Sequence, residues 1–388
     1  MPQRRAVRHT GRVPSLTAER VRADIDVLSH AGLGIDAFLS EATASLRRAV
    51  PWVAACVGLH DPATRILTGA LKYGDLKGRN ERDGEFGRIE YGGIDSTSFQ
   101  DLHATGRVAV SLHDHTGGDI ERSERMSRLM RPYYGYYDEA RFLFQDGDTF
   151  WGSLSLFRGP DDPAFSADDT AWLASLAPSF ARGVRTGLVA SLATAADEIA
   201  VGPAVIVLDP QDRIAQLSPG GRARLEEMLL GEHGGDPFSV VTALAGSARR
   251  FARGEVASPP RVRIRTNAGS WLLMHASPLS DAAGAAAGDV VITIEDARPP
   301  EIVDLIVAAF GLTARERDVA RLVLQGSDTK AIAAALFLSP YTVQDHLKAI
   351  FEKAGVRSRR ELIAKVYTDQ YEPRMASQLG PTGWFAGA

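Results

Sequence analysis

The stretch LTARERDVARLVLQGSDTKAIAAALFLSPYTVQDHLKAIFEKAGVRSRRELIAKV, residues 312–366, decides the fold at the C-terminal end of this 388-residue chain. It carries signals for four helix starts: two capping boxes, a serine N-cap before proline and an aspartate N-cap. These signals lie at Thr313 with Glu316, Ser358 with Glu361, Ser339 with Pro340, and Asp328. Gly326 and Gly355 stand where a helix end needs a left-handed residue. The spacing predicts four short helices, with a tight break between residues 336 and 340.

The third of these helices, residues 340–354, has one apolar and one polar side. At 100° per residue, one arc of about 100° that should face a core holds Val343, Leu347, Ile350 and Phe351. The opposite side carries Tyr341, Thr342, Asp345, Lys348, Ala349 and Glu352. A helix that follows another across a tight turn and keeps a free polar face is the kind that enters the major groove of DNA. A docking or dimerisation domain would share this amphipathic pattern, so the pattern alone leaves both interpretations open.

The amino-acid sequence of residues 312–366 favours DNA binding, because it resembles the LuxR/FixJ-type helix-turn-helix family. The matching pieces are Leu312-Thr313-x-Arg315-Glu316, Gly326, Lys330-x-Ile332-Ala333, Leu336, Ser339-x-x-Thr342-Val343-x-x-His346, Ile350 and Lys353-x-Gly355-Val356-x-Ser358-Arg359-x-Glu361-Leu362. The resemblance implies a DNA-binding unit whose third helix reads DNA and whose fourth helix pairs two subunits. Carried over to this chain, it implies that Gln344, Asp345 and Lys348 face the groove.

Two departures from the family pattern bear on the expected site. The family often has lysine where Gln344 stands and an aliphatic residue where Asp345 stands. Because a carboxylate repels phosphate, we expect Asp345 to accept from a cytosine amine or to lie at the groove rim. The second helix has Ala331 where the family usually has a capping glutamate, so Asp328 alone should hold the start of that helix.

Other polar residues of this stretch have expected roles in DNA contact. Thr342 and Gln344 lie near the N-terminal end of the third helix, where base edges are usually met. Glutamine can pair with adenine, and Lys348 can reach guanine or a phosphate. Phosphate contacts, which contribute affinity and register, are expected from Lys330, Arg357 and Arg359. His346, at the edge of the apolar arc, should pack between helices, with a phosphate contact as the alternative.

Charge is unevenly distributed along the chain. The net charge is −4 overall, which alone argues against a nucleic-acid partner. Residues 312–366, however, hold ten Lys or Arg and six Asp or Glu, so this segment carries +4 and the remainder −8. A basic C-terminal unit on an acidic body is typical of a DNA reader attached to another domain.

The front of the chain predicts two further α+β units. Hairpins are expected at residues 52–73 and 140–158, and a loop at 74–90. The first unit loosely resembles a GAF domain. The second resembles a PAS domain through PAVIVLDPQDRIAQLSPGGRARL, which starts at Pro203, and through its closing strands. Ser166 should cap a long helix that Pro178 kinks.

The expected fold class is multidomain α+β, with a GAF-like domain, a PAS-like domain and a C-terminal all-α four-helix LuxR-type module. The predicted boundaries are a disordered basic tail at 1–19, a GAF-like sensor domain at 20–190, a PAS-like domain at 196–298, a linker helix at 299–311, the helix-turn-helix domain at 312–370 and a flexible tail at 371–388.

The part of the chain before residue 312 contains few candidate reactive, metal-binding or ligand-binding residues. Cys56, the single cysteine, excludes an intramolecular disulfide; it is expected to be a buried small hydrophobe, with a redox thiol as the alternative. No metal site is expected from His103, His113, Asp114 and His115, whose spacing matches no standard site. A lid or packing role, with ligand contact as the alternative, is expected for Tyr133, Tyr134, Tyr136 and Tyr137. No cofactor is predicted, and the effector is unknown.

The leading hypothesis is a cytoplasmic, homodimeric transcription regulator that binds double-stranded DNA and is modulated by its front domains. No apolar run of about 18 residues predicts a membrane span. A small-molecule effector and RNA polymerase are left open as further partners. The alternative is a signalling adaptor whose helical C-terminal domain docks a protein. An enzyme is not expected, because the sequence offers no nucleophile–base pair, phosphate loop or paired acidic site.

Overall fold

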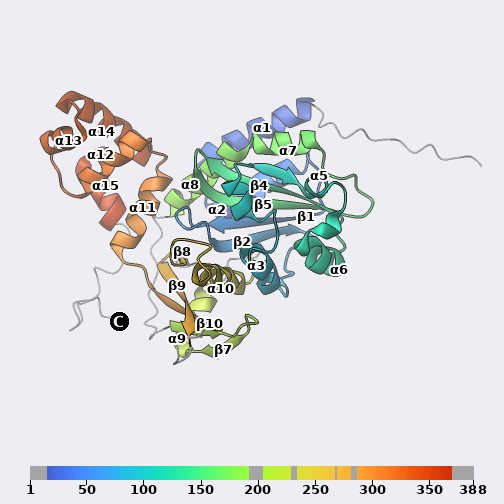
Figure 1. Ribbon diagram of the computed structural model, residues 1–388. Helices are drawn as coiled ribbons and strands as arrows, with labels where there is room; N and C mark the ends of the chain where they lie inside the picture. The colour runs from blue at the N-terminus through green and yellow to red at the C-terminus, as the bar shows by residue number, and fades with distance from the viewer. Residues whose placement is uncertain (1–14, 192–203, 229–233, 267–268, 281–285, 369–388) are drawn as a thin grey trace, which may run out of the picture.

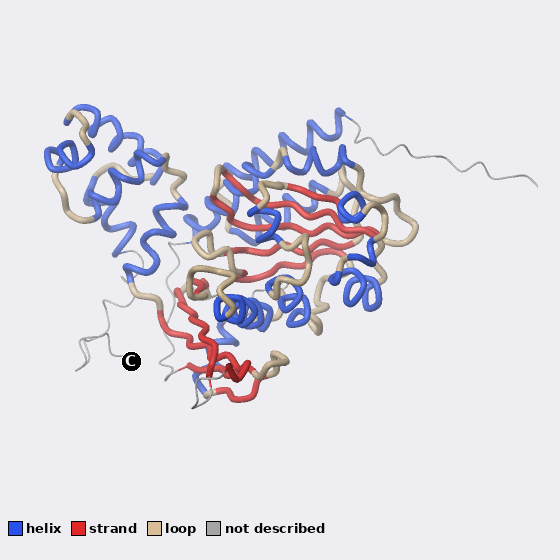
Figure 2. Tube along the Cα trace, in the orientation of Figure 1, coloured by secondary structure: helices blue, strands red, loops and turns tan. Residues whose placement is uncertain are grey.

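The computed structural model describes residues 15–191, 204–228, 234–266, 269–280 and 286–368. Two antiparallel five-stranded sheets, each with covering helices, precede a C-terminal helical module (Figures 1 and 2). The predicted tail at 371–388 and most of the one at 1–19 lie outside these ranges, and helix α1 already begins at Ser15. Within the described ranges, every helix is too short or too polar to span a bilayer.

The first sheet has the strand order β2-β1-β5-β4-β3, with every pair antiparallel. Its strands are β1 (Ala54–His60), β2 (Leu67–Gly74), β3 (Ala109–Ser111), β4 (Asp138–Asp146) and β5 (Thr149–Arg158). Both predicted hairpins, β1–β2 and β4–β5, are therefore confirmed. The register pairs Gly58 with Ser153 and Cys56 with Ser155, so these four residues share one face of the sheet.

Helices cover both faces of the first sheet. One face packs its apolar side chains, such as Val57, Leu154 and Phe142, against α1 (Ser15–His30), α2 (Ile35–Leu46) and α8 (Ala177–Ser191). The other face lies under α3 (Asp83–Tyr91), α4 (Phe99–Ala104), α5 (Leu112–Thr116), the short helical turns at 120–122 and 126–130, and α6 (Arg131–Tyr134). This second face is the one that carries Cys56 and Gly58. We call residues 15–191 the first body.

The prediction of a loop at 74–90 is wrong, because α3 (Asp83–Tyr91) lies largely within it. Its sequence DGEFGRIEY contains two glycines, which disfavour a helix in isolation. Tertiary packing overrides that preference, since α3 lies directly against α10 (Phe238–Ala252). A Cβ at Gly87 would overlap the Thr242 side chain and come within 3.0 Å of the Ser239 carbonyl oxygen, so the close approach requires glycine.

The long helix predicted to start at Ser166 is divided into α7 (Ala167–Ala174) and α8. Ser166 and Asp169 form the capping box of α7. Pro178 is the second residue of α8, a position where its missing N–H costs no intrahelical bond. The expected kink is therefore a break just before the proline.

The second sheet repeats the order of the first, β7-β6-β10-β9-β8. Its elements are β6 (Ala204–Leu208), β7 (Ile214–Leu217), α9 (Pro219–Glu227), α10, β8 (Arg261–Arg265), β9 (Trp271–Ser280) and β10 (Ala286–Asp296). Residues 239–248 of α10 are all buried, because one side of the helix meets its own sheet and the other meets α3. We call the described residues between 204 and 296 the second body, and α10 joins it to the first.

Helix α11 (Pro299–Ala309) leads into the C-terminal module, residues 312–368. The module contains α12 (Ala314–Leu324), α13 (Thr329–Leu336), α14 (Pro340–Ala354), α15 (Arg359–Ile363) and a π-helical turn at 364–368. The predicted caps at Thr313, Asp328, Ser339 and Ser358 all accept backbone N–H groups. Gly326 and Gly355 have φ of 84° and 64°, so both left-handed glycines are confirmed. The four predicted helices are present.

Candidate functional site

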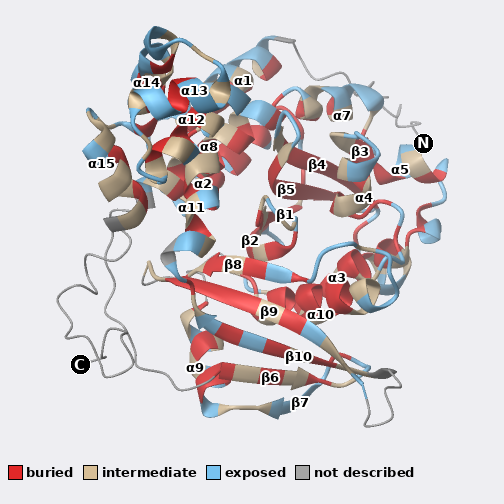
Figure 3. Ribbon diagram, turned by 60° about the vertical axis from the view of Figure 1, so that its left-hand side comes forward, coloured by how far each residue is buried: buried red, intermediate tan, exposed pale blue. Residues whose placement is uncertain are grey.

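Helix α14 presents its polar side to solvent. Val343, Leu347 and Ile350 are buried against the other helices of the module, whereas Phe351, predicted to join them, is only half-buried. Ala354 completes the buried row instead, because the short side chain fits at the end of the helix. Figure 1 places α13 and α14 on the side of the module that lies away from both sheets, and Figure 3 shows exposed residues along α14. The polar face of α14 is thus open in this arrangement.

The residues expected to face the groove lie together on that open face. Gln344, Asp345 and Lys348 are exposed, and Thr342 is half-buried with its hydroxyl 2.9 Å from that of Ser339. The Gln344 amide donates over 3.4 Å to Thr329 Oγ1 at the start of α13, so this side chain leans toward the preceding helix. The structure brings the predicted base-reading residues onto one helical surface.

The residues expected to contact phosphates differ in how far their side chains are exposed to solvent. Lys330 and Arg357 are exposed, near the starts of α13 and α15. Arg359 is half-buried and donates to the Ser327 carbonyl, so part of its guanidinium holds α15 to the turn before α13. His346 is half-buried at the edge of the apolar row. Lys330 and Arg357 are therefore the more accessible cations for a polyanion.

The turn between α13 and α14 carries a feature that our sequence reasoning missed. Phe337 ends α13 in the left-handed region, with φ of 56°, and its side chain is 95% exposed. Tyr341, the second residue of α14 and already expected on its polar side, is 79% exposed. Left-handed backbone is uncommon for an aromatic residue, and two open aromatic rings beside the polar face of α14 extend the surface that a partner could contact.

Two ion and hydrogen-bond contacts hold the C-terminal half of α14 in place. Lys353 Nζ lies 2.6 Å from Glu316 Oε2, and the same carboxylate accepts the Thr313 N–H of the α12 cap. Burial acts to raise the pKa of Glu316, but the Lys353 ammonium and the Thr313 hydrogen bonds lower it below its usual value. Lys365 Nζ donates over 2.9 Å to the carbonyl of Ala354, the last residue of α14. These contacts fix the direction in which α14 points.

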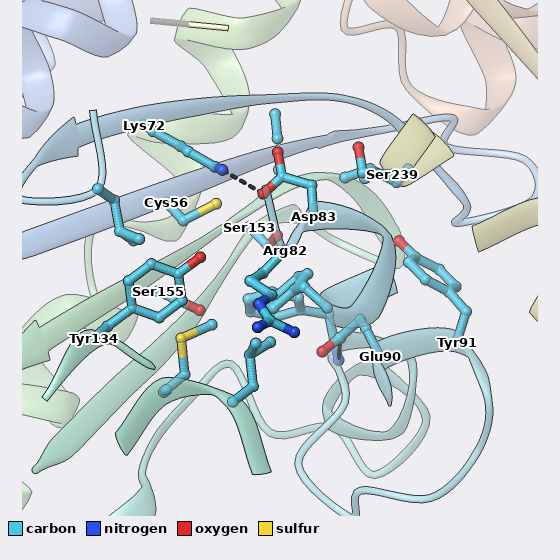
Figure 4. Close-up of a pocket in the computed structure, with 18 of the residues that line it drawn as sticks. Cys56, Lys72, Arg82, Asp83, Glu90, Tyr91, Tyr134, Ser153, Ser155 and Ser239 are labelled. Atoms are coloured by element: carbon cyan, nitrogen blue, oxygen red, sulfur yellow. Dashed lines mark hydrogen bonds and ion pairs between the residues drawn. The ribbon is translucent and has the colours of Figure 1, made fainter. Parts of the chain in front are cut away.

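A second candidate site is a cavity between the first sheet and α3 (Figure 4). Strands β1, β2 and β5 form its floor, and α3, the 126–134 segment and the start of α10 form its sides. Its cavity volume is about 40 Å³, and the space free of atoms is about 650 Å³ once the open mouth is counted. Lys72 and Asp83 form a buried ion pair in its wall. Burial raises the pKa of the Cys56 thiol to about 12, so this cysteine is a neutral lining residue and not a reactive thiolate.

Beside the cavity lies a cluster of buried charges that sequence reasoning did not identify. It consists of Arg125, Arg141, Glu90, Glu139 and Asp95. Arg125 lies 2.8 Å from Glu139 and Arg141 lies 2.8 Å from Glu90. Burial would raise the pKa of Asp95, but Arg125 and hydroxyl donors hold it well below its usual range. The one available signal was the charged pair Glu139 and Arg141 alternating with apolar residues along β4.

The histidines and tyrosines considered in the sequence analysis do not form one cluster; they differ in their contacts and in their burial. His103 lies beside Gln145 and stacks on Phe150, whereas His115 contacts Ser96 and Arg107. Among the described residues, no group of three or more His, Cys, Asp or Glu side chains could hold a metal ion. Of the tyrosines, Tyr136 is buried, Tyr134 lines the cavity, and Tyr133 and Tyr137 are partly exposed.

Comparison with known proteins agrees with the geometry of the module. The family described as "Bacterial regulatory proteins, luxR family" matches residues 311–366. The spore germination protein GerE of Bacillus subtilis is 40% identical over 55 residues, which cover 14% of this chain and 74% of GerE. A Mycobacterium bovis protein described as an HTH-type transcriptional regulator is 52% identical over 52 residues, 13% of this chain but only 6% of that protein. The chain thus spans a small part of the mycobacterial relative.

Solved structures offer weaker likenesses. The VqmA dimer of Vibrio cholerae is 18% identical over 43% of this chain and 82% of its own, with a TM-score of 0.21. The bacteriophytochrome of R. palustris is 11% identical over 74% of this chain and 64% of its own, with a TM-score of 0.29.

The capped helices, the left-handed turns and the open polar face of α14 all lie in the segment that these regulators share. Their family is one of transcription regulators and not of enzymes. Because the match to GerE covers most of that protein, the chain belongs to the LuxR family of bacterial regulatory proteins.

Proposed function

We propose that this chain is a sequence-specific, DNA-binding transcription regulator that reads its operator with α14 and is controlled by its two front bodies. The observation that carries the proposal is the open polar face of α14, on which Gln344, Asp345 and Lys348 are exposed. Lys330 and Arg357, exposed cations near the starts of α13 and α15, are suited to phosphate contacts.

We propose further that the front bodies act as GAF-like and PAS-like sensor or dimerisation domains. Three observations support this: the two sheets share one strand order, the first body contains a cavity, and its cavity wall includes α3, which packs on the second body. A homodimer formed through α15 would place two copies of α14 about one helical turn of DNA, roughly 34 Å, apart. A palindromic operator is the expected target.

The test is DNA binding by the full chain to genomic fragments selected with the purified protein, measured at several salt concentrations. Lys348→Ala should weaken binding and reduce the slope of log affinity against log salt by about one, because one cation that neutralises a phosphate is lost. Lys77→Ala, an exposed lysine of the first body, is the matched control and should leave the slope unchanged. An unchanged affinity for Lys348→Ala would remove this residue from the interface.

The adaptor alternative makes a different prediction in the same experiment. If the helical module docks a protein, the selected fragments should share no sequence, and affinity should be as low for them as for random DNA of equal length. Recovery of a common, two-fold symmetric sequence would instead support the regulator.

A further inference from the structure

We propose that the cavity beside α3 binds a small, uncharged ring compound that donates a hydrogen bond to His60 and Ser153. The inference rests on the sensor role proposed above and names the chemical class of its ligand. Figure 4 shows Ser153 pointing into the cavity from β5, and His60 lines the same cavity from the end of β1.

The two polar residues lie close to Gly58 on the cavity floor. Gly58 lies opposite Ser153 in the sheet and two residues before His60. A Cβ at Gly58 would come within 2.8 Å of Ser153 Oγ and 2.9 Å of His60 Cε1. Only glycine fits here without displacing these side chains, and the Ser153 hydroxyl and the His60 ring therefore lie close together on the cavity floor.

Both residues have a buried polar atom that is not satisfied within the described chain. Ser153 is 0% and His60 5% exposed, and neither Ser153 Oγ nor His60 Nε2 has a hydrogen-bond partner among the described residues. His60 Nδ1 lies 3.2 Å from the Gly58 carbonyl oxygen, an acceptor, so Nδ1 carries the proton. His60 Nε2 consequently has a lone pair that can accept a hydrogen bond from a ligand. Burial lowers the pKa of His60 to about 3, so the ring stays neutral at physiological pH.

The rest of the lining favours a ligand without charge. Each charged side chain in the wall already has a partner of opposite sign: Lys72 pairs with Asp83, Arg82 with Glu85, and Glu90 with Arg141. The remaining wall is mainly apolar and includes Leu67, Leu76, Phe86, Phe99, Leu129 and Met130. A charged ligand would lose its hydration without gaining a free counter-charge, whereas a neutral ring would bury apolar surface.

Calorimetric titration of the full chain with indole and with benzofuran tests the inference. The two rings have nearly the same shape, but only indole has an N–H donor. We expect indole to bind about tenfold more tightly than benzofuran, because only indole satisfies the buried acceptors. Ser153→Ala and His60→Phe should each bring the affinity ratio close to one, and Gly58→Ala should weaken both ligands, because the added methyl group would displace the Ser153 and His60 side chains.

Thr43→Val is the matched control. The Thr43 hydroxyl is also buried without a partner, but it lies on α2, across the sheet from the cavity, so its removal should leave the indole preference intact. Equal affinity of indole and benzofuran for the unmodified chain, no binding of either, or a preference that survives Ser153→Ala in a folded protein would each overturn the inference. DNA binding measured on the same preparations separates this outcome from failure of the regulator proposal, because the inference can fail while operator binding is retained.

Discussion

Phe337 joins a strained backbone to an open aromatic ring at the turn before α14. A left-handed conformation costs a residue with a Cβ of this size about 1 kcal/mol, and a side chain that is 95% exposed recovers little of that cost by packing. Phe337 therefore lowers the free energy of unfolding of the chain. Its exposed ring adds apolar surface next to the start of α14.

Phe337→Asn should raise the free energy of unfolding by about 0.5–1 kcal/mol, because asparagine tolerates left-handed backbone. Chemical denaturation of the full chain measures the change. Tyr341→Asn, which removes another exposed ring but from ordinary helical backbone, should not stabilise the protein. If Phe337→Asn is destabilising, the ring makes a contact that the free chain already needs.

Asp345 stands where the LuxR family often has an aliphatic residue, and this difference has a clear consequence for DNA binding. Its exposed carboxylate lies on the same face as Lys348 and should repel phosphates that approach that face. Asp345→Asn should therefore tighten binding to random DNA several-fold at low salt and lower the preference for the selected operator. Competition of operator and random duplexes measures both changes. A weaker affinity for random DNA would show that the carboxylate does not face the duplex.

At the scale of elements, α12 and α14 are joined by the contact between Glu316 and Lys353. The pKa of Glu316 is lower in the folded chain than the ordinary value of about 4.3. A depressed carboxyl pKa contributes stability that is complete above the unfolded-state value and is lost as pH falls through the folded-state value. The contact therefore supports the position of α14 at neutral pH and fails in acid.

Glu316→Gln should lower the free energy of unfolding by about 1–2 kcal/mol at pH 7. The difference from the unmodified chain should shrink as pH falls below about 4, because the unmodified Glu316 then protonates as well. Denaturation curves between pH 3 and 7 provide the measurement, with the exposed Glu352→Gln as control. A difference that is independent of pH would mean that the charge of Glu316 does not contribute.

At the scale of the whole molecule, the first body, the second body and α11 meet at Arg263. Its Nε lies 2.7 Å from Asp61 Oδ2, and its Nη2 lies 2.5 Å from Asp61 Oδ1, so β8 is tied to the end of the first hairpin. Arg263 Nη1 also donates over 3.2 Å to the Glu301 carbonyl oxygen of α11. The apolar core of the first body continues through Ile306 of α11 into the module. A change in either body can therefore alter where α14 is held.

Arg263→Met should cost about 3–5 kcal/mol of unfolding free energy, because it leaves the buried Asp61 carboxylate without its counter-ion. The double change Asp61→Asn with Arg263→Met should cost clearly less than the sum of the two single changes. A double-mutant cycle by chemical denaturation gives the coupling energy. Additive costs would show that the two side chains do not stabilise each other in solution.

Local chemistry sufficed to predict the module from the sequence. The caps at Thr313, Asp328 and Ser339 and the left-handed Gly326 and Gly355 act within a few residues, so their positions specify where each helix begins and ends. The hairpins of the first sheet were predictable for the same reason, since alternation and turns are short-range patterns. The polar face of α14 followed from helical periodicity alone.

Contacts between distant segments could not be inferred in this way. Helix α3 has a poor helical sequence and exists because Gly87 lets α10 approach, about 150 residues later in the chain. The cavity needs Gly58 and Ser153 to be paired across two strands, and the buried charges need Arg125 to reach Glu139 and Asp95. Such groups acquire their environment only when strands and helices pack, because burial and pairing depend on neighbours that a one-dimensional pattern does not identify.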